Sequence, residues 1–365
     1  MLRKSYSRNL FGAILALCAI MLFGSVRLMA QTEVRGFRPG LTVEGVNYFL
    51  PKTVFRVVVV AEKTVTTPGE FALYADRYLR QPDAPTATST LWTIKSLSIQ
   101  AIGVPDSSKA YNIKLRAKTS APLVSLTDDG LLLGVNVECE AEPLPALPAT
   151  VPAPKPVNGR DYMTQEILAA GSVAKMAQLT AEEIYDIRDS RNALVRGEAD
   201  NTPKDGAQLK LMLDNLDKQL YALESMFKGQ SLTSTEVLTF NYEPSSEPVE
   251  QDMLCRFSRR LGVVDADDLS GEPIWISVQP VGSLPAAEAN EDVARRRQKM
   301  EQGLYVNQPA RAQVVVKTAT QPLLAAEFPV AQMGTTEILS DALFNKKLST
   351  KVYIYQHTGS VESIE

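Results

Sequence analysis

The segment Leu209-Lys-Leu-Met-Leu-Asp-Asn-Leu-Asp-Lys-Gln-Leu-Tyr-Ala-Leu-Glu-Ser-Met-Phe227 decides how this chain of 365 residues is expected to fold. Six apolar residues recur in it at alternating spacings of four and three: Leu209, Leu213, Leu216, Leu220, Leu223 and Phe227. On a helix of 3.6 residues per turn, their side chains fall on one stripe. The sequence therefore predicts a helix that buries this stripe against another element of the protein.

The segment before it supplies a partner helix with a looser stripe of small and apolar residues. Its members are Val173, Ala177, Ala181, Ile184, Ile187, Arg191, Leu194 and Val195. Gly197 is placed to end this first helix. Thr202 is placed to cap the second helix, with Pro203 at its first position and Asp205 at its third. Because the turn is short, the two helices are expected to form an antiparallel hairpin.

On both sides of the hairpin, β-branched and aromatic residues alternate in the manner of strands. The run Thr53–Val60 is nearly apolar on both faces, although one face carries Arg56, and this is typical of a central strand. A short helix is expected at Phe71–Leu79. Other strands are predicted at residues 92–102, 111–118, 124–137, 237–242, 253–257, 274–278, 313–317, 323–330 and 351–355. The sequence therefore predicts an α+β fold in which two β-rich domains flank an antiparallel helical hairpin.

A proline-rich segment separates the first β-rich region from the hairpin. It contains Pro143, Pro145, Pro148, Pro152, Pro154 and Pro156. Prolines at this density exclude the interior of a helix or sheet, so the segment is expected to be extended and semi-rigid. The predicted divisions are a signal peptide (1–30), an N-terminal β-rich domain (31–142), a Pro-rich linker (143–159), the helical hairpin (160–229) and a C-terminal β-rich domain (230–365).

The first 30 residues have the three parts of a secretory signal peptide: a basic start, an apolar run over residues 10–23, and an A-x-A-like cleavage site ending at Ala30. The run is short for a membrane span, which makes a retained anchor the minor alternative. Cys18 suggests a lipoprotein, but Leu17 is bulky where such sites have Gly or Ala. We expect a Sec-type export to the periplasm or the outside of the cell, with no transmembrane segment after cleavage.

The mature chain is expected to be acidic. Cleavage removes four positive charges and no negative one, so the formal net charge falls from −4 to −8. No basic stripe is present in the sequence, which disfavours a nucleic-acid partner. Only Cys139 and Cys255 remain, and they either form one disulfide or stay as two thiols.

Residues for common kinds of catalysis are scarce. The only histidine, His357, falls in a predicted solvated turn, which is a poor place for the rigid geometry of a catalytic triad. One histidine and two distant cysteines do not provide the closely spaced ligands of a zinc site. We therefore assign no catalytic, cofactor-binding or metal-binding residues, and lean against an enzyme.

Two groups of carboxylates leave alternatives open. Asp128 and Asp129 could act on a glycosidic bond, but neighbouring strand residues point to opposite faces, and Asp-Gly is typical of a hairpin turn. The acidic loop around Asp265, Asp267, Asp268 and Glu272 could hold Ca²⁺ or be a solvated turn. Its glycine falls too late for an EF-hand.

Arg188 and Arg191 are the residues that we single out as a candidate partner surface. They lie on or beside the helical seam and face a helix that carries Asp214, Asp217 and Glu224. Either they form interhelical ion pairs that fix the register, or they line a groove for another protein.

Aromatic residues of the N-terminal region offer another kind of surface. Tyr48, Phe49, Tyr74, Tyr78 and Trp92 fall within one predicted domain. They could stack on sugars as in a glycan binder, or belong to the core.

The two β-rich regions share three landmarks in the same order. The pairs are Gly45 to Pro51 with Gly303 to Pro309, Ile99–Gly103 with Val330–Gly334, and Gly130 with Gly359. Repeated landmarks suggest that one β module occurs twice in the chain.

Several stretches carry a resemblance to a known family. They are residues 45–53, 102–106, 182–191, 200–206 with the leucine-rich helix that follows, 343–347 and 358–359. Through them the chain resembles DUF4831, a family of secreted Bacteroidetes proteins described as a domain of unknown function. The resemblance covers essentially all of the mature chain. It implies an envelope protein with no assigned activity and supplies no catalytic residues.

We therefore expect a non-enzymatic component of the cell envelope that binds another envelope protein or has a structural role. The alternative is a carbohydrate-binding or carboxylate-based hydrolytic envelope protein. No cofactor is expected.

Overall fold

The computed structural model describes residues 33–36, 45–114, 124–200, 203, 205–282, 303–340 and 350–365. The predicted signal peptide, residues 1–30, lies outside the described residues. Strands make up 47% of the structure and helices 23%, and the three sheets are antiparallel, so the predicted mixture of α and β structure is confirmed.

The strands are β1 (Glu33–Gly36), β2 (Val46–Thr67), β3 (Ser89–Lys114), β4 (Val124–Leu126), β5 (Leu132–Val135), β6 (Gln230–Tyr242), β7 (Val249–Ser258), β8 (Gly262–Val264), β9 (Glu272–Pro280), β10 (Gly303–Lys317), β11 (Pro322–Ser340), β12 (Val352–Ile354) and β13 (Val361–Ile364). The helices are η1 (Ala72–Tyr74), α2 (Ala75–Leu79), η2 (Gly159–Tyr162), α3 (Gln165–Leu168), α4 (Val173–Arg196) and α5 (Gly206–Lys228).

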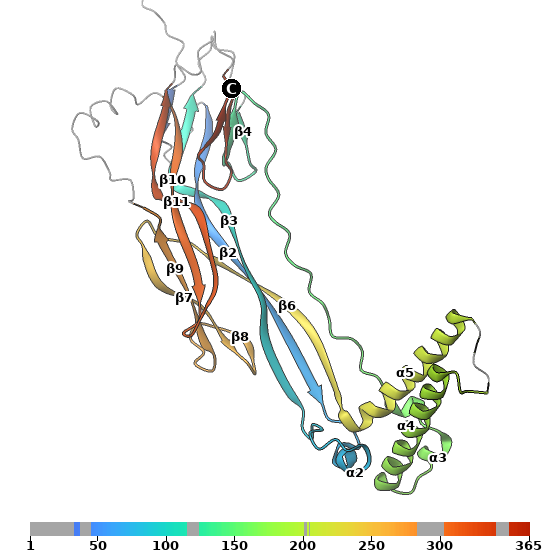
Figure 1. Ribbon diagram of the computed structural model, residues 1–365. Coiled ribbons are helices and arrows are strands. Elements are labelled where there is room, and N and C mark those ends of the chain that lie inside the picture. Colours follow the sequence, from blue (N-terminus) through green and yellow to red (C-terminus); the bar gives the residue numbers. More distant parts are fainter. Residues whose placement is uncertain are drawn as a thin grey trace, which may run out of the picture.

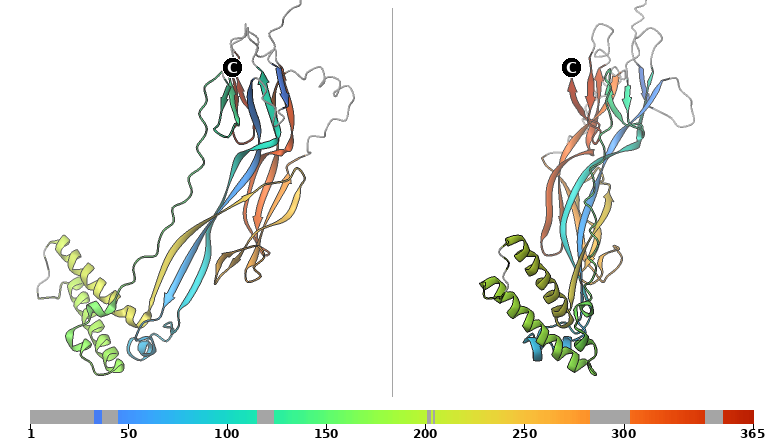
Figure 2. Two further views of the ribbon diagram at one scale, coloured as in Figure 1. Left: turned by 180° about the vertical axis from the view of Figure 1, so that it is seen from behind. Right: turned by 90° about the vertical axis from the view of Figure 1, so that its right-hand side faces the viewer.

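Long strands give the molecule its elongated shape (Figure 1). The first sheet has the order β1-β3-β2-β6, with β2 of 22 residues and β3 of 26. As predicted from its two nearly apolar faces, β2 is central and pairs with β3 on one side and β6 on the other. At one end, β2, β3 and β6 extend beyond the other sheets and lead to the helices (Figure 2).

Two further sheets pack with the first, and together the three form the β body. The second sheet has the order β11-β10-β9-β7-β8, and the third has β13-β12-β5-β4. A core between the first two sheets contains Phe55 and Val57 from β2 with Ile276 and Val314 from β9 and β10. A second core, built on β2, β5, β10 and β12, lies toward the end that is distant from the helices.

The two β-rich regions do not form the separate domains that the sequence analysis placed at 31–142 and 230–365. Strand β6 pairs with β2 in the first sheet, and β12 pairs with β5 in the third sheet. Each of these two sheets therefore contains strands of both regions. Both cores of the β body are also shared between them. Pairing between segments distant in the sequence leaves no local signal, which explains the difference.

The Pro-rich segment is extended, as predicted, but it lies along the molecule rather than between two units. It runs from the end of the β body that carries β4 to the helices, and meets β6 near them (Figures 1 and 2). We call residues 142–157 the strap. In its middle, Val151 forms one isolated bridge with Thr235 of β6.

The pairing register supports the predicted repeat of one β module. In the hairpin of β2 and β3, Val46 pairs with Ile113 and Lys52 with Val104. In the hairpin of β10 and β11, Leu304 pairs with Leu339 and Ala310 with Val330. In both, the first strand advances six residues (46 to 52, 304 to 310) while the return strand covers nine (113 to 104, 339 to 330). The two hairpins therefore carry the same irregularity of three extra residues.

A tight turn covers each irregularity in the same way. The Phe49 N–H donates to the Gly130 carbonyl, and the Asn307 N–H donates to the Gly359 carbonyl, both at 2.9 Å. The repeating unit thus comprises β2 to β5 and β10 to β13. When the irregularities of the two hairpins are superposed, Val104 aligns with Val330. The sequence match of Ile99–Gly103 with Val330–Gly334 is therefore wrong in register.

Within the described residues, no helix combines the length and the apolarity that a membrane span requires.

Candidate functional site

The helical end is built on the predicted hairpin, which the structure confirms. Helix α4 ends at Gly197, whose φ of 72° is the left-handed conformation expected of such a cap. Helix α5 begins later than predicted, because the Asp205 side chain caps it by accepting from the Ala207 N–H at 3.1 Å. The predicted cap, Thr202, lies outside the described residues.

The junction of α5 with β6 depends on Gly229. Its φ is 72°, and a Cβ atom at this position would lie 2.2 Å from the Thr67 carbonyl oxygen. Only glycine satisfies both conditions, since other residues are strained at positive φ and would also clash. The helical end is therefore joined directly to the sheet, without a linker.

The apolar stripe of α5 is buried at its base and partly open at its tip. Leu223 and Phe227 are fully buried, and the Phe227 ring lies 5.3 Å from that of Phe71. The rest of the base core comes from short elements and from α4: Ala75, Leu79, Met163, Ile167, Ala177, Ala181, Ile184 and Ile187. Farther along α5, Leu209, Leu213, Leu216 and Leu220 are only half-buried.

Two residues of α5 outside the stripe add to the apolar surface of the tip. Leu211 is 61% exposed and Met212 is 40% exposed. On α4, Val173 is 50% exposed and Val195 is 59% exposed, which contradicts their predicted places on the packed stripe. The sequence analysis missed Leu211 and Met212, although the run Leu-Lys-Leu-Met-Leu contains more apolar residues than one stripe can hold.

Arg188 and Arg191 form ion pairs across the hairpin, which is the structural one of the two predicted roles. The Arg188 guanidinium lies 2.5 Å from Glu224 Oε1, and Arg191 Nε lies 2.6 Å from Asp217 Oδ1. Glu224 also accepts from Lys228 Nζ at 2.5 Å. Burial opposes ionisation of Glu224, but the hydrogen bonds from Lys228 and Arg188 outweigh it and lower the pKa of this carboxyl.

Tyr185 connects the arginines with α2. Its hydroxyl donates to the Tyr78 carbonyl at 3.0 Å, and the Arg188 guanidinium lies 5.3 Å from the centre of its ring. These contacts hold α4 on the short helix that follows β2. The ion pairs therefore join the two helices of the hairpin, and this hydrogen bond holds α4 on α2.

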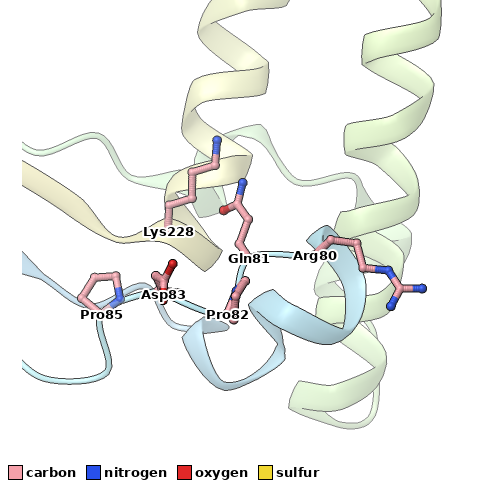
Figure 3. A pocket seen from close by; sticks show the side chains of 7 residues that line it. Arg80, Gln81, Pro82, Asp83, Pro85 and Lys228 are labelled. Atoms are coloured by element: carbon pink, nitrogen blue, oxygen red, sulfur yellow. The ribbon is translucent and has the colours of Figure 1, made fainter.

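A pocket of about 330 Å³ lies beside this junction, between the loop after α2 and the end of α5 (Figure 3). It is lined by Arg80, Gln81, Pro82, Asp83, Ala84, Pro85 and Lys228. In Figure 3, the Arg80 side chain points away from Lys228, and the Lys228 amine is already bonded to Glu224. The lining offers one carboxylate and one paired amine, which is not an arrangement for nucleophilic or acid–base catalysis.

The comparisons with known proteins agree with the resemblance seen in the sequence. The profile of the family described as a domain of unknown function, DUF4831, matches residues 44–362. The chain belongs to this family. No curated protein and no solved structure matches it.

In this member of the DUF4831 family, the residue His357 lies in a packed turn and not in the solvated turn that was predicted. Thr358 beside it is 1% exposed. A Cβ atom on Gly103 would lie 2.9 Å from the His357 Cα atom, so the turn is pressed against β3. The His357 ring packs near that of Tyr355, at 5.7 Å.

The carboxylates lie as expected for turns. Asp128 and Asp129 are exposed in the turn between β4 and β5. In the acidic loop, Arg256 donates to the carbonyls of Ala266 at 2.7 Å and Gly271 at 3.1 Å. A guanidinium thus occupies carbonyl groups that a cation would need, and among the described residues no group of three His, Cys, Asp or Glu is placed to hold a metal ion.

The five aromatic residues of the N-terminal region do not form one surface. Tyr48 is buried in the core of the β body that lies away from the helices. Trp92 is buried against Gly262, under the Lys63 amine. Tyr74 and Tyr78 pack on the core of the helical end. These residues therefore provide no common platform for stacking on a sugar.

The two cysteines are free thiols in different surroundings. Cys255 is buried in the core between the first two sheets, and burial raises the pKa of its thiol to about 11. Cys139 is half-buried near β12, and burial raises its pKa as well.

Proposed function

We propose that this protein is an exported, non-enzymatic component of a Bacteroidetes cell envelope, and that the tip of its helical hairpin binds another envelope protein. The partly open apolar stripe at the tip is the observation that carries the proposal. Leu209, Leu213 and Leu216 are half-buried, and Met212, which lies on the adjoining side of the helix, is 40% exposed. Apolar groups gathered in this way mark binding surfaces in soluble proteins.

The position of the hairpin supports the same role. The helices lie at one end of the long molecule, away from the β body (Figures 1 and 2). The ion pairs of Arg188 and Arg191 hold them in a fixed orientation, so the tip is presented as a rigid surface. A rigid surface loses little conformational entropy on binding.

The arginines belong to the frame of this surface in the proposal. Arg191 is partly exposed while paired with Asp217, so it can form the polar rim of an interface whose centre is the leucine stripe. The apolar centre is expected to supply most of the binding free energy, and the rim to set orientation.

Export is proposed from the sequence of residues 1–30, and fractionation of the native cells tests it. Detection of the chain only in the cytoplasm would contradict this part of the proposal.

A photo-crosslinking residue at Met212 tests the binding surface in the native envelope. The control is the same residue at Leu269, an exposed leucine between β8 and β9 in the β body. We expect one crosslinked adduct from position 212 and none from position 269. Adding Leu209→Glu should remove the adduct. Equal crosslinking at both positions, or none at position 212, would refute the proposal.

A further inference from the structure

The outer edge of β6 is the starting observation. Strand β6 is the last strand of its sheet, so no strand of that sheet lies on its outer side. Its 13 residues pair with β2 without a register shift, from Gln230 to Tyr242. The strand contains neither proline nor glycine, and Glu236 is its one charged residue. A long, regular edge of this composition is a template for pairing with another strand.

The bond made by Thr235 shows which backbone groups face outward. Its N–H donates to the Val151 carbonyl of the strap at 2.8 Å. In an antiparallel ladder, alternate residues direct their N–H and C=O groups to the same side. The outward-facing residues are therefore Ser231, Thr233, Thr235, Val237, Thr239 and Asn241.

The strap lies against the half of this edge nearest the helices, where Val157 bonds with Gln230 and Val151 bonds with Thr235. Its 15 steps from Glu142 to Val157 span about 47 Å as an extended proline-rich chain. The 13 residues of β6 span about 43 Å. Figures 1 and 2 show the strap meeting β6 near the helices and running apart from it toward the far end of the molecule. Because six of its 16 residues are prolines, which lack an N–H donor, the strap cannot form a continuous ladder with β6 and covers the edge without extending the sheet.

Two glutamine side chains hold the ends of the strap. Gln356 accepts from the Glu142 N–H at 2.8 Å. At the other end, Gln230 accepts from the Val157 N–H at 2.8 Å and donates to the Val157 carbonyl at 2.6 Å. Between these anchors, the apolar side chains Leu144, Leu147 and Val151 are exposed, so little buried apolar surface holds the middle of the strap.

We propose that the strap is a guard on the β6 edge. It keeps the edge from accepting a strand, and its displacement opens the edge to a second copy of this chain, with β6 pairing antiparallel to β6. A two-fold axis at Thr235 pairs residues 231–239 of one copy with those of the other, so each outward N–H in this range has a carbonyl partner. In that register Glu236 lies opposite Ser234, so the two Glu236 side chains are diagonal neighbours and not a directly facing pair. The proposal does not depend on the function proposed for the helical tip.

Cutting the strap tests the proposal on the mature chain. A recognition site for a sequence-specific protease is inserted between Leu147 and Pro148, where the strap is exposed. The molar mass is measured by analytical ultracentrifugation before and after cleavage, over a range of concentrations. We expect a monomer before cleavage and a dimer after it, which dissociates on dilution. Hydrogen exchange should then show slower exchange at Ser231, Thr233 and Val237 in the dimer.

Thr235→Pro identifies the interface. The Thr235 N–H faces outward, so proline there removes a donor of the edge without breaking the ladder with β2. The cut Thr235→Pro chain should remain monomeric, whereas the matched variant Thr235→Val should dimerise like the parent chain. If Thr235→Pro does not fold, as judged by circular dichroism, Val237→Lys places a charge on the edge for the same purpose. A cut parent chain that stays monomeric, or a dimer that survives both edge variants, would overturn the proposal.

Discussion

Two identical truncations on α5 measure how far the leucine stripe is buried. Leu223 and Leu213 both lie on the stripe, and both can be changed to alanine with the same loss of side-chain atoms. Leu223 is fully buried in the core of the helical end, whereas Leu213 is half-buried near the tip. The difference in stability between the two variants therefore reports their surroundings and not their chemistry.

The expected magnitudes follow from this difference. Removing a fully buried leucine side chain leaves a cavity and costs about 3 kcal/mol or more. A half-exposed leucine gains less free energy from burial, and its truncation leaves no closed cavity, so the loss of its side chain should cost about 1 kcal/mol. We expect Leu223→Ala to be the more destabilising by about 2 kcal/mol.

The assay can separate the helical end from the β body. Both tryptophans of the chain, Trp92 and Trp275, lie in strands of the β body, β3 and β9. Urea unfolding followed by circular dichroism at 222 nm reports mainly on α4 and α5, and tryptophan fluorescence reports on the β body. Leu223→Ala should shift the first transition to lower urea concentration, with a smaller shift for Leu213→Ala.

Equal losses of stability for the two variants would refute this account of the hairpin. Such a result would mean that the tip is buried as fully as the base. A negligible effect of Leu223→Ala would show instead that α5 does not pack on the core of the helical end.

Four other predictions concern single groups. Arg191→Ala should lower the urea midpoint only slightly, because its ion pair with Asp217 is exposed to water, and a loss as large as that of Leu223→Ala would indicate a buried pair. The pKa of Glu224 is lower in the folded than in the unfolded state, so its ionised form stabilises the fold at a pH above the unfolded-state pKa. This contribution should disappear as the pH falls through the folded-state pKa. In unfolding measured as a function of pH, Glu224→Gln should lack this part of the acid dependence. Cys139 should react with a thiol reagent before Cys255, because the thiol of Cys255 is buried and has a pKa of about 11. A mass-spectrometric time course measures the order, and the opposite order would contradict the placement of the two thiols. Asn307→Ala should destabilise the β body by about 2 kcal/mol. The buried Asn307 amide donates to the carbonyls of Pro51 and Thr358, and both carbonyls would lose this partner. Tryptophan fluorescence during urea unfolding measures the effect.

Local patterns predicted the elements of the helical end well. The spacing of the leucines located α5, Gly197 located the end of α4, and the acidic residues of α5 located the partners of both arginines. Each of these signals arises within one helix or between its immediate neighbours. The burial of individual positions was less predictable: Val195 is exposed because the hairpin extends beyond the elements that cover its base.

Non-local contacts explain what the sequence did not reveal. The pairing of β6 with β2 and of β12 with β5 joins segments separated by the whole helical end, and no periodicity within either segment indicates its partner. The buried hydrogen bonds of Asn307 and the Arg256 bonds in the acidic loop likewise depend on tertiary approach. The glycine and proline landmarks located the repeat, but its register required the paired strands.

The direction of the long strands determines how this molecule would respond to a mechanical load. A pull between the helices and the far end of the β body acts along β2, β3 and β6 (Figure 1). The ladder bonds between antiparallel neighbours lie across that axis. These bonds are therefore loaded together in shear and share the tension, instead of breaking one after another. Along its length the molecule should behave as a stiff rod that yields only when many bonds fail at once.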